Sequence, residues 1–333
     1  MYAPCDMRAI IIAKPIGHEG LEMRDVAVPS PAKGEVRIAI HATAVNRADL
    51  IQARGAYPAP PDAPADIPGL EYAGVIDAIG EGVTNFAIGD RVFGLAGGGT
   101  YAEFVVVHAR TVTRMPERLS FVEASAIPEA FITAYDAMVS QAGLSSGETV
   151  LVHAVGSGVG TAAAQIAKAI GARCIGTARS AEKLKRVACP SVACNNSQFY
   201  EPIMKLTSGR GVDVVLDLVG GDYMADSLRV LSSKGRLVLV GLLAGNKTEV
   251  DLGLVLRKRL RIMGTVLRSR PLEEKIATAA AFERHVVPLI DSGVFAPVID
   301  RVMTLEDARQ AHAYVASNVG YGKVVLEVVR DAQ

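Results

Sequence analysis

The chain has 333 residues, of which 50% are hydrophobic and 21% are charged. This length favours two domains, because single hydrophobic cores stop growing at about 250–300 residues. Lys plus Arg and Asp plus Glu both number 35, so a formal charge of zero gives no attraction to nucleic acid or to an anionic membrane. No apolar run reaches the length of a membrane span, and no signal-peptide pattern begins the sequence. We therefore expect a cytoplasmic protein that binds neither nucleic acid nor membranes.

The first third of the chain is predicted to be β-rich. Short alternating or β-branched runs are separated by glycine turns, which is typical of a small barrel-like domain; the runs are Arg8–Lys14, Glu35–Ala44, Tyr72–Ile79, Arg91–Gly94 and Tyr101–Val107. The segment Tyr57–Pro68 holds five prolines in twelve residues. We expect it to form a stiff, non-helical lid.

From Phe121 the pattern changes to alternating helices and strands. Helices are expected over Phe121–Ser140 with a break near Pro128, and then around Ala181–Val187 and Asp222–Leu231; strands are expected over Arg173–Thr177, Val212–Leu218, Arg236–Gly241 and Leu260–Val266. This alternation predicts an α/β fold with a doubly wound parallel sheet. After a helix over Leu272–Ser292, the pieces Val298–Met303, Leu305–Ala316 and Lys323–Val329 favour a return to the first domain. We therefore expect one domain at 1–126 and 271–333, and an inserted domain at 127–270.

The stretch Thr149–Gly160 indicates a phosphate-binding turn. The apolar run Val150–Val152 predicts a buried strand, and the helix-favouring run Thr161–Gly171 follows. Between them glycine allows backbone N–H groups to approach a pyrophosphate at the helix N-terminus. The candidate dinucleotide-binding residues are Gly156, Ser157, Gly158, Val159 and Gly160.

The next strand predicts which nicotinamide cofactor is bound. Sites that prefer NAD place a carboxylate at the end of this strand to hold the ribose hydroxyls. Here the strand ends Gly176-Thr-Ala-Arg-Ser180 without one, so a 2′-phosphate would meet Arg179, Ser180 and Lys183, with Thr177 beside them. We expect NADP(H); the alternative is that Arg179 and Lys183 only cover a solvated helix start.

The four cysteines and six histidines predict no catalytic constellation. Cys5, Cys174, Cys189 and Cys194 lack the spacing of a metal site or a disulfide framework, so we expect free thiols in a reducing cytosol. The histidines have the spacing of surface or strand residues, and His153, which is nearest to the expected cofactor, is interpreted as structural.

Several motifs together resemble the quinone oxidoreductase branch of the medium-chain dehydrogenase/reductase superfamily. They are Ala44-Val-Asn-Arg-Ala-Asp49, Ile67-Pro-Gly-Leu-Glu-Tyr-Ala-Gly74, Gly89-Asp-Arg-Val-Phe-Gly94, Gly98-Gly-Thr-Tyr-Ala-Glu103 and Ala154–Gly160. Asn46–Asp49 with Leu267–Arg270 is most similar to the tumour-suppressor-inducible subgroup. The resemblance covers nearly the whole chain. It implies a GroES-like domain plus a Rossmann domain with the cofactor between them.

The resemblance also implies site residues and a homodimer. Tyr57 matches a tyrosine that faces the nicotinamide, either to hydrogen-bond the substrate or only to pack in the lid. Thr133, Gly241, Leu242 and Leu267 are implied as further cofactor contacts. The homodimer would form through the edge strand Arg261–Val266.

Zinc-dependent relatives have Cys, His and Cys ligands where this chain aligns Asn46, Leu70 and Glu129. Leucine cannot bind a metal and asparagine is a poor ligand, so we expect a zinc-less site in which Asn46 contributes a hydrogen bond. Without a Lewis acid, alcohol oxidation is disfavoured, whereas a quinone accepts hydride readily. We expect an NADPH:quinone oxidoreductase; the alternatives are an NADPH-dependent enone reductase and an NADPH-binding regulatory protein with little turnover.

Overall fold

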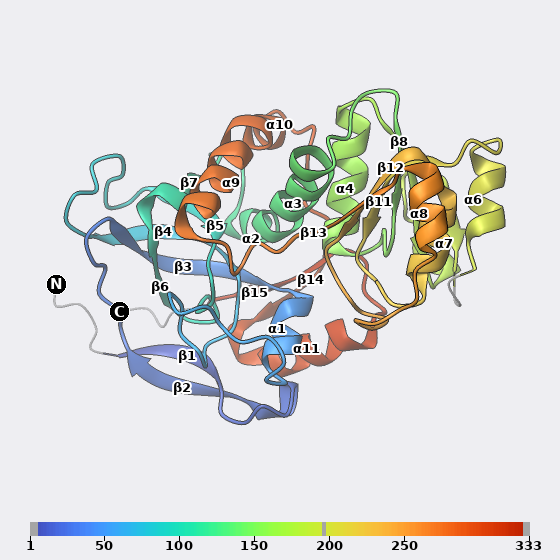
Figure 1. The fold of residues 1–333 in the computed structure, drawn as a ribbon. Helices are drawn as coiled ribbons and strands as arrows, with labels where there is room; N and C mark the ends of the chain where they lie inside the picture. Colours follow the sequence, from blue (N-terminus) through green and yellow to red (C-terminus); the bar gives the residue numbers. More distant parts are fainter. Residues whose placement is uncertain (1–5, 195–197, 329–333) are drawn as a thin grey trace. The chain divides into compact units, whose positions relative to one another are not determined.

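The computed structural model describes residues 6–194 and 198–328 (Figure 1). The chain divides into unit 1, residues 1–132 and 267–333, and unit 2, residues 133–266. Unit 2 thus begins at residue 133, where the sequence suggests 127, and ends at 266, where the sequence suggests 270. Its start lies inside helix α3 (Pro128–Tyr135).

Unit 1 is built on a mostly antiparallel sheet. Its strand order is β14-β15-β3-β4-β5-β7, and β6 pairs with β3. The bounds are β3 (Glu35–Val45), β4 (Glu71–Ile79), β5 (Arg91–Leu95), β6 (Phe104–His108), β7 (Thr113–Arg114), β14 (Ile299–Thr304) and β15 (Lys323–Glu327). Strand β15 pairs antiparallel with β3, from Val324 beside Val45 to Glu327 beside Ala42. The C-terminal segment therefore completes the sheet that the N-terminal segment begins, as a GroES-like fold requires.

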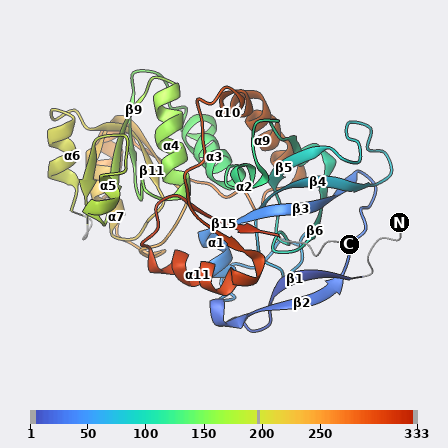
Figure 2. The same ribbon diagram turned by 180° about the vertical axis from the view of Figure 1, so that it is seen from behind.

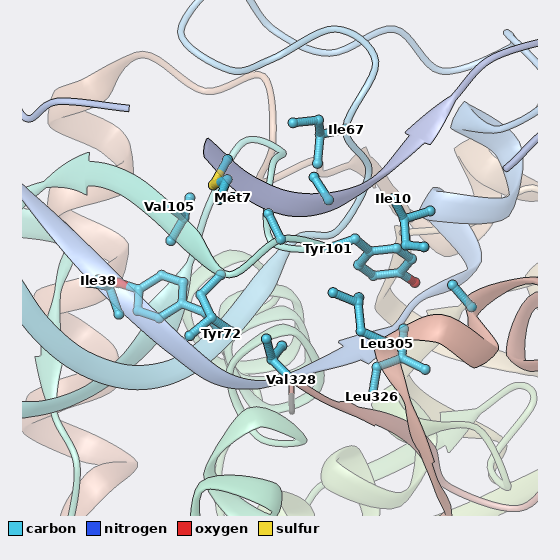
Figure 3. Close-up of a cluster of buried hydrophobic side chains, with 14 of the residues drawn as sticks. Met7, Ile10, Ile38, Ile67, Tyr72, Tyr101, Val105, Leu305, Leu326 and Val328 are labelled. Atoms are coloured by element: carbon cyan, nitrogen blue, oxygen red, sulfur yellow. The ribbon is translucent and has the colours of Figure 1, made fainter. Parts of the chain in front are cut away.

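A hydrophobic cluster fills unit 1 beneath the hairpin of β1 (Asp6–Ile12) and β2 (Leu21–Ala27) (Figure 3). Ile10, Ile38, Leu305 and Leu326 are all at most 3% exposed in this cluster. Burying each such side chain contributes about 1.5–3 kcal/mol. The strand β2 was not expected from the sequence, because its apolar residues are interrupted by charged ones and only Leu21 is buried.

Most helices of unit 1 are short, and the longest is α9 with 14 residues. They are α1 (Arg47–Gln52), α2 (Phe121–Ser125), α9 (Leu272–His285), α10 (Val287–Asp291) and α11 (Ala308–Ser317), with 3-10 turns η1 (His18–Gly20), η2 (Ala109–Thr111) and η4 (Leu305–Asp307). Helix α1 was not foreseen, and Asn46 and Asp49 form its capping box. The single helix expected over Leu272–Ser292 is instead divided near Val286, just before Pro288.

Unit 2 is a parallel sheet with the order β10-β9-β8-β11-β12-β13. Its strands are β8 (Thr149–Val152), β9 (Arg173–Ala178), β10 (Ser191–Ala193), β11 (Val212–Asp217), β12 (Leu231–Leu239) and β13 (Arg261–Gly264). Helix α4 (Gly158–Ala169) lies on one face of the sheet, and α7 (Tyr223–Val230) and α8 (Leu252–Lys258) lie on the other (Figures 1 and 2). This is the doubly wound Rossmann arrangement that the alternating pattern predicts.

Strands β8 and β11 are buried along their whole lengths, and they occupy the middle of the sheet. Strand β13 lies at the edge of the sheet, as expected. Helix α5 (Ala181–Leu184) is shorter than expected, and β10 and α6 (Tyr200–Leu206) were not foreseen. The segment η3 (Asp136–Gln141) is a π-helical continuation of α3. Across the described residues, the structure contains no helix that combines the length and apolar character needed to cross a bilayer.

Candidate functional site

The glycine turn of unit 2 joins β8 to α4. Ser157 is the N-cap of α4, and its hydroxyl accepts a hydrogen bond from the Gly160 N–H at 3.1 Å. A Cβ atom on Gly160 would stand 2.5 Å from the Ala154 carbonyl oxygen and 2.6 Å from the Val155 Cα. Because both neighbours are backbone, only glycine allows the first turn of the helix to lie this close to the turn that follows β8. Gly156, Gly158 and Val159 complete the turn.

Three other predicted cofactor contacts, Thr177, Gly241 and Leu242, lie at or just after the carboxyl ends of the parallel strands β9 and β12. These ends share one edge of the sheet, where open α/β folds bind ligands. Thr177 is the penultimate residue of β9, and Gly241 and Leu242 follow β12; Leu242 is 53% exposed. A Cβ on Gly241 would meet the Leu218 carbonyl oxygen at 2.7 Å, so this loop also passes close to the backbone that follows β11.

Two buried polar atoms in unit 2 lack a hydrogen-bond partner among the described residues: Thr133 Oγ1 and Asp217 Oδ2. The other oxygen of Asp217, at the end of β11, accepts from the backbone N–H groups of Val219 and Gly220 at 2.8 and 2.9 Å. Buried polar groups normally have partners, so unpaired atoms are reasonable places for a ligand to supply them. The glycine turn fits the pyrophosphate of a dinucleotide, and these two atoms are candidates for further ligand contacts.

The tip of β9 carries Arg179 and Ser180. Arg179 is exposed directly after the strand, and no ion pair joins it to a carboxylate within residues 6–194 and 198–328. Ser180 is the N-cap of α5, but its hydroxyl makes no capping bond. Lys183 lies in the same short helix, and Glu182 pairs with Lys185 at 2.7 Å. The tip therefore presents donors and a positive charge.

His153 is fully buried beside the turn, where it links two elements of unit 2. Its Nδ1 lies 2.8 Å from Thr177 Oγ1 and its Nε2 lies 2.9 Å from Ser227 Oγ. Burial lowers the pKa of His153 to about 4, so the ring is neutral at pH 7. These contacts give His153 the structural position that its sequence context suggests, and they engage the hydroxyl of Thr177.

Unit 1 contains a largely buried group of polar side chains around Lys323, which we call the Lys323 cluster: Asn46, Glu71, Glu129 and Lys323. The Lys323 ammonium donates to Glu71 Oε1 at 2.6 Å, to Asn46 Oδ1 at 2.5 Å and to the Val45 carbonyl at 3.3 Å. Lys323 is 4% exposed and Glu71 is fully buried. The three N–H bonds of the Lys323 ammonium are thus all used.

Asn46 is committed to the interior of this cluster. Its amide nitrogen donates to Glu71 Oε1 at 2.8 Å, while its amide oxygen accepts from Lys323. The hydrogen bond that the sequence suggested for Asn46 is therefore found within the protein, where the side chain orients Glu71 and Lys323.

Glu129 stands at the first turn of α3, and its backbone N–H donates to Glu71 Oε2 at 2.8 Å. Its own carboxyl group forms no hydrogen bond with any described residue, and part of the side chain remains accessible. Burial is the main cause that raises the pKa of Glu129 to about 8, and the negative charge of Glu71 is the second. The positive charge of Lys323 opposes both.

A second buried network adjoins the cluster through Asp49. The carboxylate of Asp49 accepts from the Asn46 N–H at 2.7 Å, the Gly69 N–H at 3.3 Å and the Tyr101 hydroxyl at 3.2 Å. Tyr101 also lies 3.1 Å from His312 Nε2. Burial raises the pKa of Asp49 to about 6 and lowers that of His312 to about 3. His312 was expected at a surface or strand position, but it is buried in helix α11.

Arg268 fixes the proline-rich loop that begins at Tyr57. It donates to the Gly97 carbonyl at 2.6 Å, the Tyr57 carbonyl at 3.1 Å and Gln52 Oε1 at 2.7 Å. Its guanidinium carbon lies 5.0 Å from the centre of the Tyr57 ring, a cation–π distance. The loop has no regular secondary structure, and Lys275 pairs with Asp62 within it at 2.8 Å. Tyr57 is therefore held in place by its backbone and its ring face.

Partial burial raises the pKa of the Tyr57 phenol above its ordinary value of 10, so the hydroxyl keeps its proton at neutral pH. Leu267, the remaining predicted cofactor contact, precedes Arg268 and belongs to unit 1. Sequence reasoning missed Glu71, Lys323 and Arg268 as site residues. A charged residue inside an otherwise apolar strand end, as in Gly322-Lys-Val-Val-Leu326, is the signal that could have found Lys323.

Nothing in the described residues brings three His, Cys, Asp or Glu side chains together in an arrangement that could hold a metal ion. At the positions aligned with zinc ligands, Leu70 has no donor atom and the Asn46 amide is already engaged. Cys174, Cys189 and Cys194 are free thiols, whereas Cys5 lies outside the described residues.

Comparison with known proteins agrees with both units. Residues 32–117 match the family model described as the alcohol dehydrogenase GroES-like domain, and residues 158–283 match the model described as zinc-binding dehydrogenase. The chain is 34% identical to a quinone oxidoreductase of Homo sapiens over 96% of this chain and 97% of that protein.

Solved structures show the same similarity over nearly the whole chain. A mycobacterial protein in complex with NADPH has 29% identity and a TM-score of 0.85, covering 96% of this chain and 100% of that one. An NAD-dependent alcohol dehydrogenase has 32% identity and a TM-score of 0.85, covering 97% and 100%. One of these proteins is described with NADPH and the other with NAD, so the cofactor of this chain depends on its own residues.

Proposed function

Because the chain belongs to the quinone oxidoreductase-like proteins of the medium-chain dehydrogenase/reductase superfamily, we propose that it reduces quinones with NADPH and without a metal. The chain is an oxidoreductase-family protein, and a nicotinamide cofactor is consistent with the glycine turn. When bound, the reduced nicotinamide supplies a hydride. The protein must then hold the cofactor, orient the acceptor and stabilise the charge that develops on the acceptor.

The observation that carries the metal-free part of the proposal is the state of Asn46. Its amide satisfies Glu71 and Lys323, and Leu70 offers no ligand. Of the three aligned positions only Glu129 retains a donor, and a catalytic zinc site uses about three protein ligands. Of the cluster, only the Glu129 carboxyl has no hydrogen bond to another described residue, and a single proton donor suits an acceptor that takes hydride easily better than it suits an alcohol.

The choice of NADPH rests on Arg179 and Ser180 at the tip of β9, where no carboxylate stands to hold ribose hydroxyls. Hydrogen bonds to charged groups are worth about 1.5–3 kcal/mol each. One such bond to a 2′-phosphate would give about a tenfold preference or more. We assign Tyr57 the role of orienting the acceptor, through a hydroxyl that keeps its proton.

The test follows the absorbance of NADPH or NADH while the purified protein is supplied with 1,4-benzoquinone or with the enone 3-buten-2-one. A parallel assay supplies simple alcohols and NADP⁺ and follows the formation of NADPH. Quinone-dependent turnover that favours NADPH supports the proposal. Turnover with the enone alone would favour enone reduction, and no turnover at all would favour a regulatory NADPH-binding role.

Two further measurements test the rest of the proposal. Elemental analysis should find no stoichiometric zinc, and a chelator should leave turnover unchanged; about one zinc per chain would contradict the metal-free site. We also propose a homodimer through β13, because an unpaired sheet edge can pair with its own copy. Light scattering at micromolar concentration should give the mass of two chains, and a single-chain mass would contradict it.

A further inference from the structure

Reduction of a quinone or an enone requires one proton for each hydride, and the hydrogen bonds of unit 1 indicate where that proton comes from. We propose that Glu129 is the general acid that delivers it. This inference rests on the proposed function and adds to it a catalytic residue.

Apart from Glu129, the charged groups of the Lys323 cluster and the adjoining Asp49 are already occupied. Lys323 donates to three acceptors. Glu71 accepts from Lys323, from the Asn46 amide and from the Glu129 N–H, which is the pattern of an ionised carboxylate. Asp49 accepts from two backbone N–H groups and from Tyr101. None of these three has a proton available without breaking a buried hydrogen bond.

The exposure of each side chain limits which groups a substrate could contact. Glu71 and Asp49 are fully buried and Lys323 is 4% exposed, so a substrate could not contact them. Glu129 and Tyr57 retain accessible surface, and within the described residues neither the Glu129 carboxyl nor the Tyr57 hydroxyl makes a hydrogen bond. The charge of Glu129 also acts on the Tyr57 phenol, so the two groups lie near each other in unit 1, and we infer that they are the groups that contact an acceptor.

The acidity of the two groups distinguishes Glu129 from Tyr57. The phenol of Tyr57 has a pKa above 10, whereas burial and the adjacent Glu71 raise the pKa of Glu129 to about 8. General acids work best when their pKa lies near the working pH. Glu129 is thus protonated at pH 7 and able to give up its proton, while Tyr57 is suited to donate a hydrogen bond that stays intact.

The charged groups around Glu129 come from several elements and favour the protonated carboxyl on balance. Glu71 on β4 and Asp49 on α1 raise its pKa, whereas Lys323 on β15 and Arg268 lower it. Because Lys323 is paired directly with Glu71, the two largely cancel each other, and burial decides the result.

Hydride transfer and proton transfer from Glu129 together balance the reaction. The acceptor gains two electrons with the hydride, and the nicotinamide is oxidised by the same two electrons. The O–H bond of Glu129 breaks, and its proton forms a new O–H bond on the quinone oxygen or a C–H bond on the enone. Glu129 is left as a carboxylate and regains a proton from water, so the net consumption is one NADPH and one proton per acceptor.

The test compares wild type with Glu129→Gln, Glu129→Asp and Tyr57→Phe, using 1,4-benzoquinone between pH 6 and 10. Because general acid catalysis contributes about 10²–10⁴-fold, Glu129→Gln should lower kcat by about a hundredfold or more with little change in KM. Wild type should lose turnover as the pH rises through about 8, and Glu129→Gln should lack this alkaline limb. Tyr57→Phe should keep the limb, and Glu129→Asp should recover part of the rate. The exposed control Glu81→Gln should behave as wild type.

A readout without cofactor or turnover comes from infrared spectroscopy. At pH 7 the wild-type spectrum should contain the carbonyl stretch of a protonated carboxylic acid that is missing from Glu129→Gln and that titrates near pH 8. An active wild type with an unaffected Glu129→Gln variant, or a Glu129 carboxyl that titrates near 4.5, would overturn the role of Glu129 alone. A wild type that oxidises no NADPH with either acceptor would overturn the proposed function, and the general acid with it.

Discussion

The two units build their candidate sites by opposite means. In unit 2 the site is the backbone of consecutive residues, Gly156–Gly160, on which helix α4 begins. In unit 1 the site is a set of side chains that the chain brings together over long separations: Glu71 lies 25 residues from Asn46, 58 from Glu129 and 252 from Lys323. The turn depends on small size and the cluster depends on charge balance, so different substitutions should disrupt them.

The largest effect should follow from unbalancing the buried charges. Lys323→Met leaves the Glu71 carboxylate buried without its cation, which should lower the free energy of unfolding by about 3–5 kcal/mol. The double variant Lys323→Met/Glu71→Gln should recover part of this loss. Chemical denaturation measures it, and the exposed pair Lys33–Glu81 supplies the control: Lys33→Met should cost no more than about 1 kcal/mol. Equal losses at the two lysines would show that the cluster does not depend on charge balance.

The glycine turn should be sensitive to volume rather than to charge. Gly160→Val places a side chain against the Ala154 carbonyl and the Val155 backbone, so the start of helix α4 must move away from the turn that follows β8. Affinity for NADPH, measured by fluorescence titration, should fall by at least about a hundredfold, roughly 2.7 kcal/mol. Gly264→Ala is the matched control, because a Cβ there meets nothing within 4 Å. An unchanged affinity in Gly160→Val would place the cofactor away from the turn.

Tyr57→Phe removes one hydroxyl from unit 1 while keeping the ring that packs against Arg268. We expect kcat with 1,4-benzoquinone to fall by about 10- to 100-fold, less than the loss of a full oxyanion-hole donor. Stability should be unchanged, because the hydroxyl has no partner among the described residues. A wild-type rate would reduce Tyr57 to a packing residue of the loop.

The smallest effect should be on cofactor choice. Arg179→Ala should weaken NADPH binding by about tenfold and leave NADH binding nearly unchanged, because only the 2′-phosphate would contact the guanidinium. Titration of both cofactors into both proteins gives the ratio. Lys185→Ala is a suitable control, since Lys185 is paired with Glu182. Equal affinities for NADPH and NADH in wild type would contradict the assignment.

The contrast between the units also explains what the sequence could predict. The glycine turn, the buried strand before it and the helix after it are consecutive, so their pattern alone indicates the fold of unit 2. Burial of Lys323 and Glu71 depends on the pairing of β15 with β3, which no local pattern reveals. Glu129 could be aligned with a ligand position, but its raised pKa arises from Glu71 and from the packing around it. The sequence did not predict β2 either, because tertiary contacts form this strand although its local β-propensity is weak.

The pairing of β15 with β3 has a consequence for synthesis on the ribosome. Residue 323 is made 252 residues after Glu71, which at about 5–20 residues per second corresponds to roughly 13–50 s. Until then the Ala42–Val45 edge of β3 has no partner and Glu71 has no cation, while unit 2, a continuous segment, is already complete. Nascent chains arrested before residue 323 should therefore contain a protease-resistant unit 2 beside an open, aggregation-prone sheet.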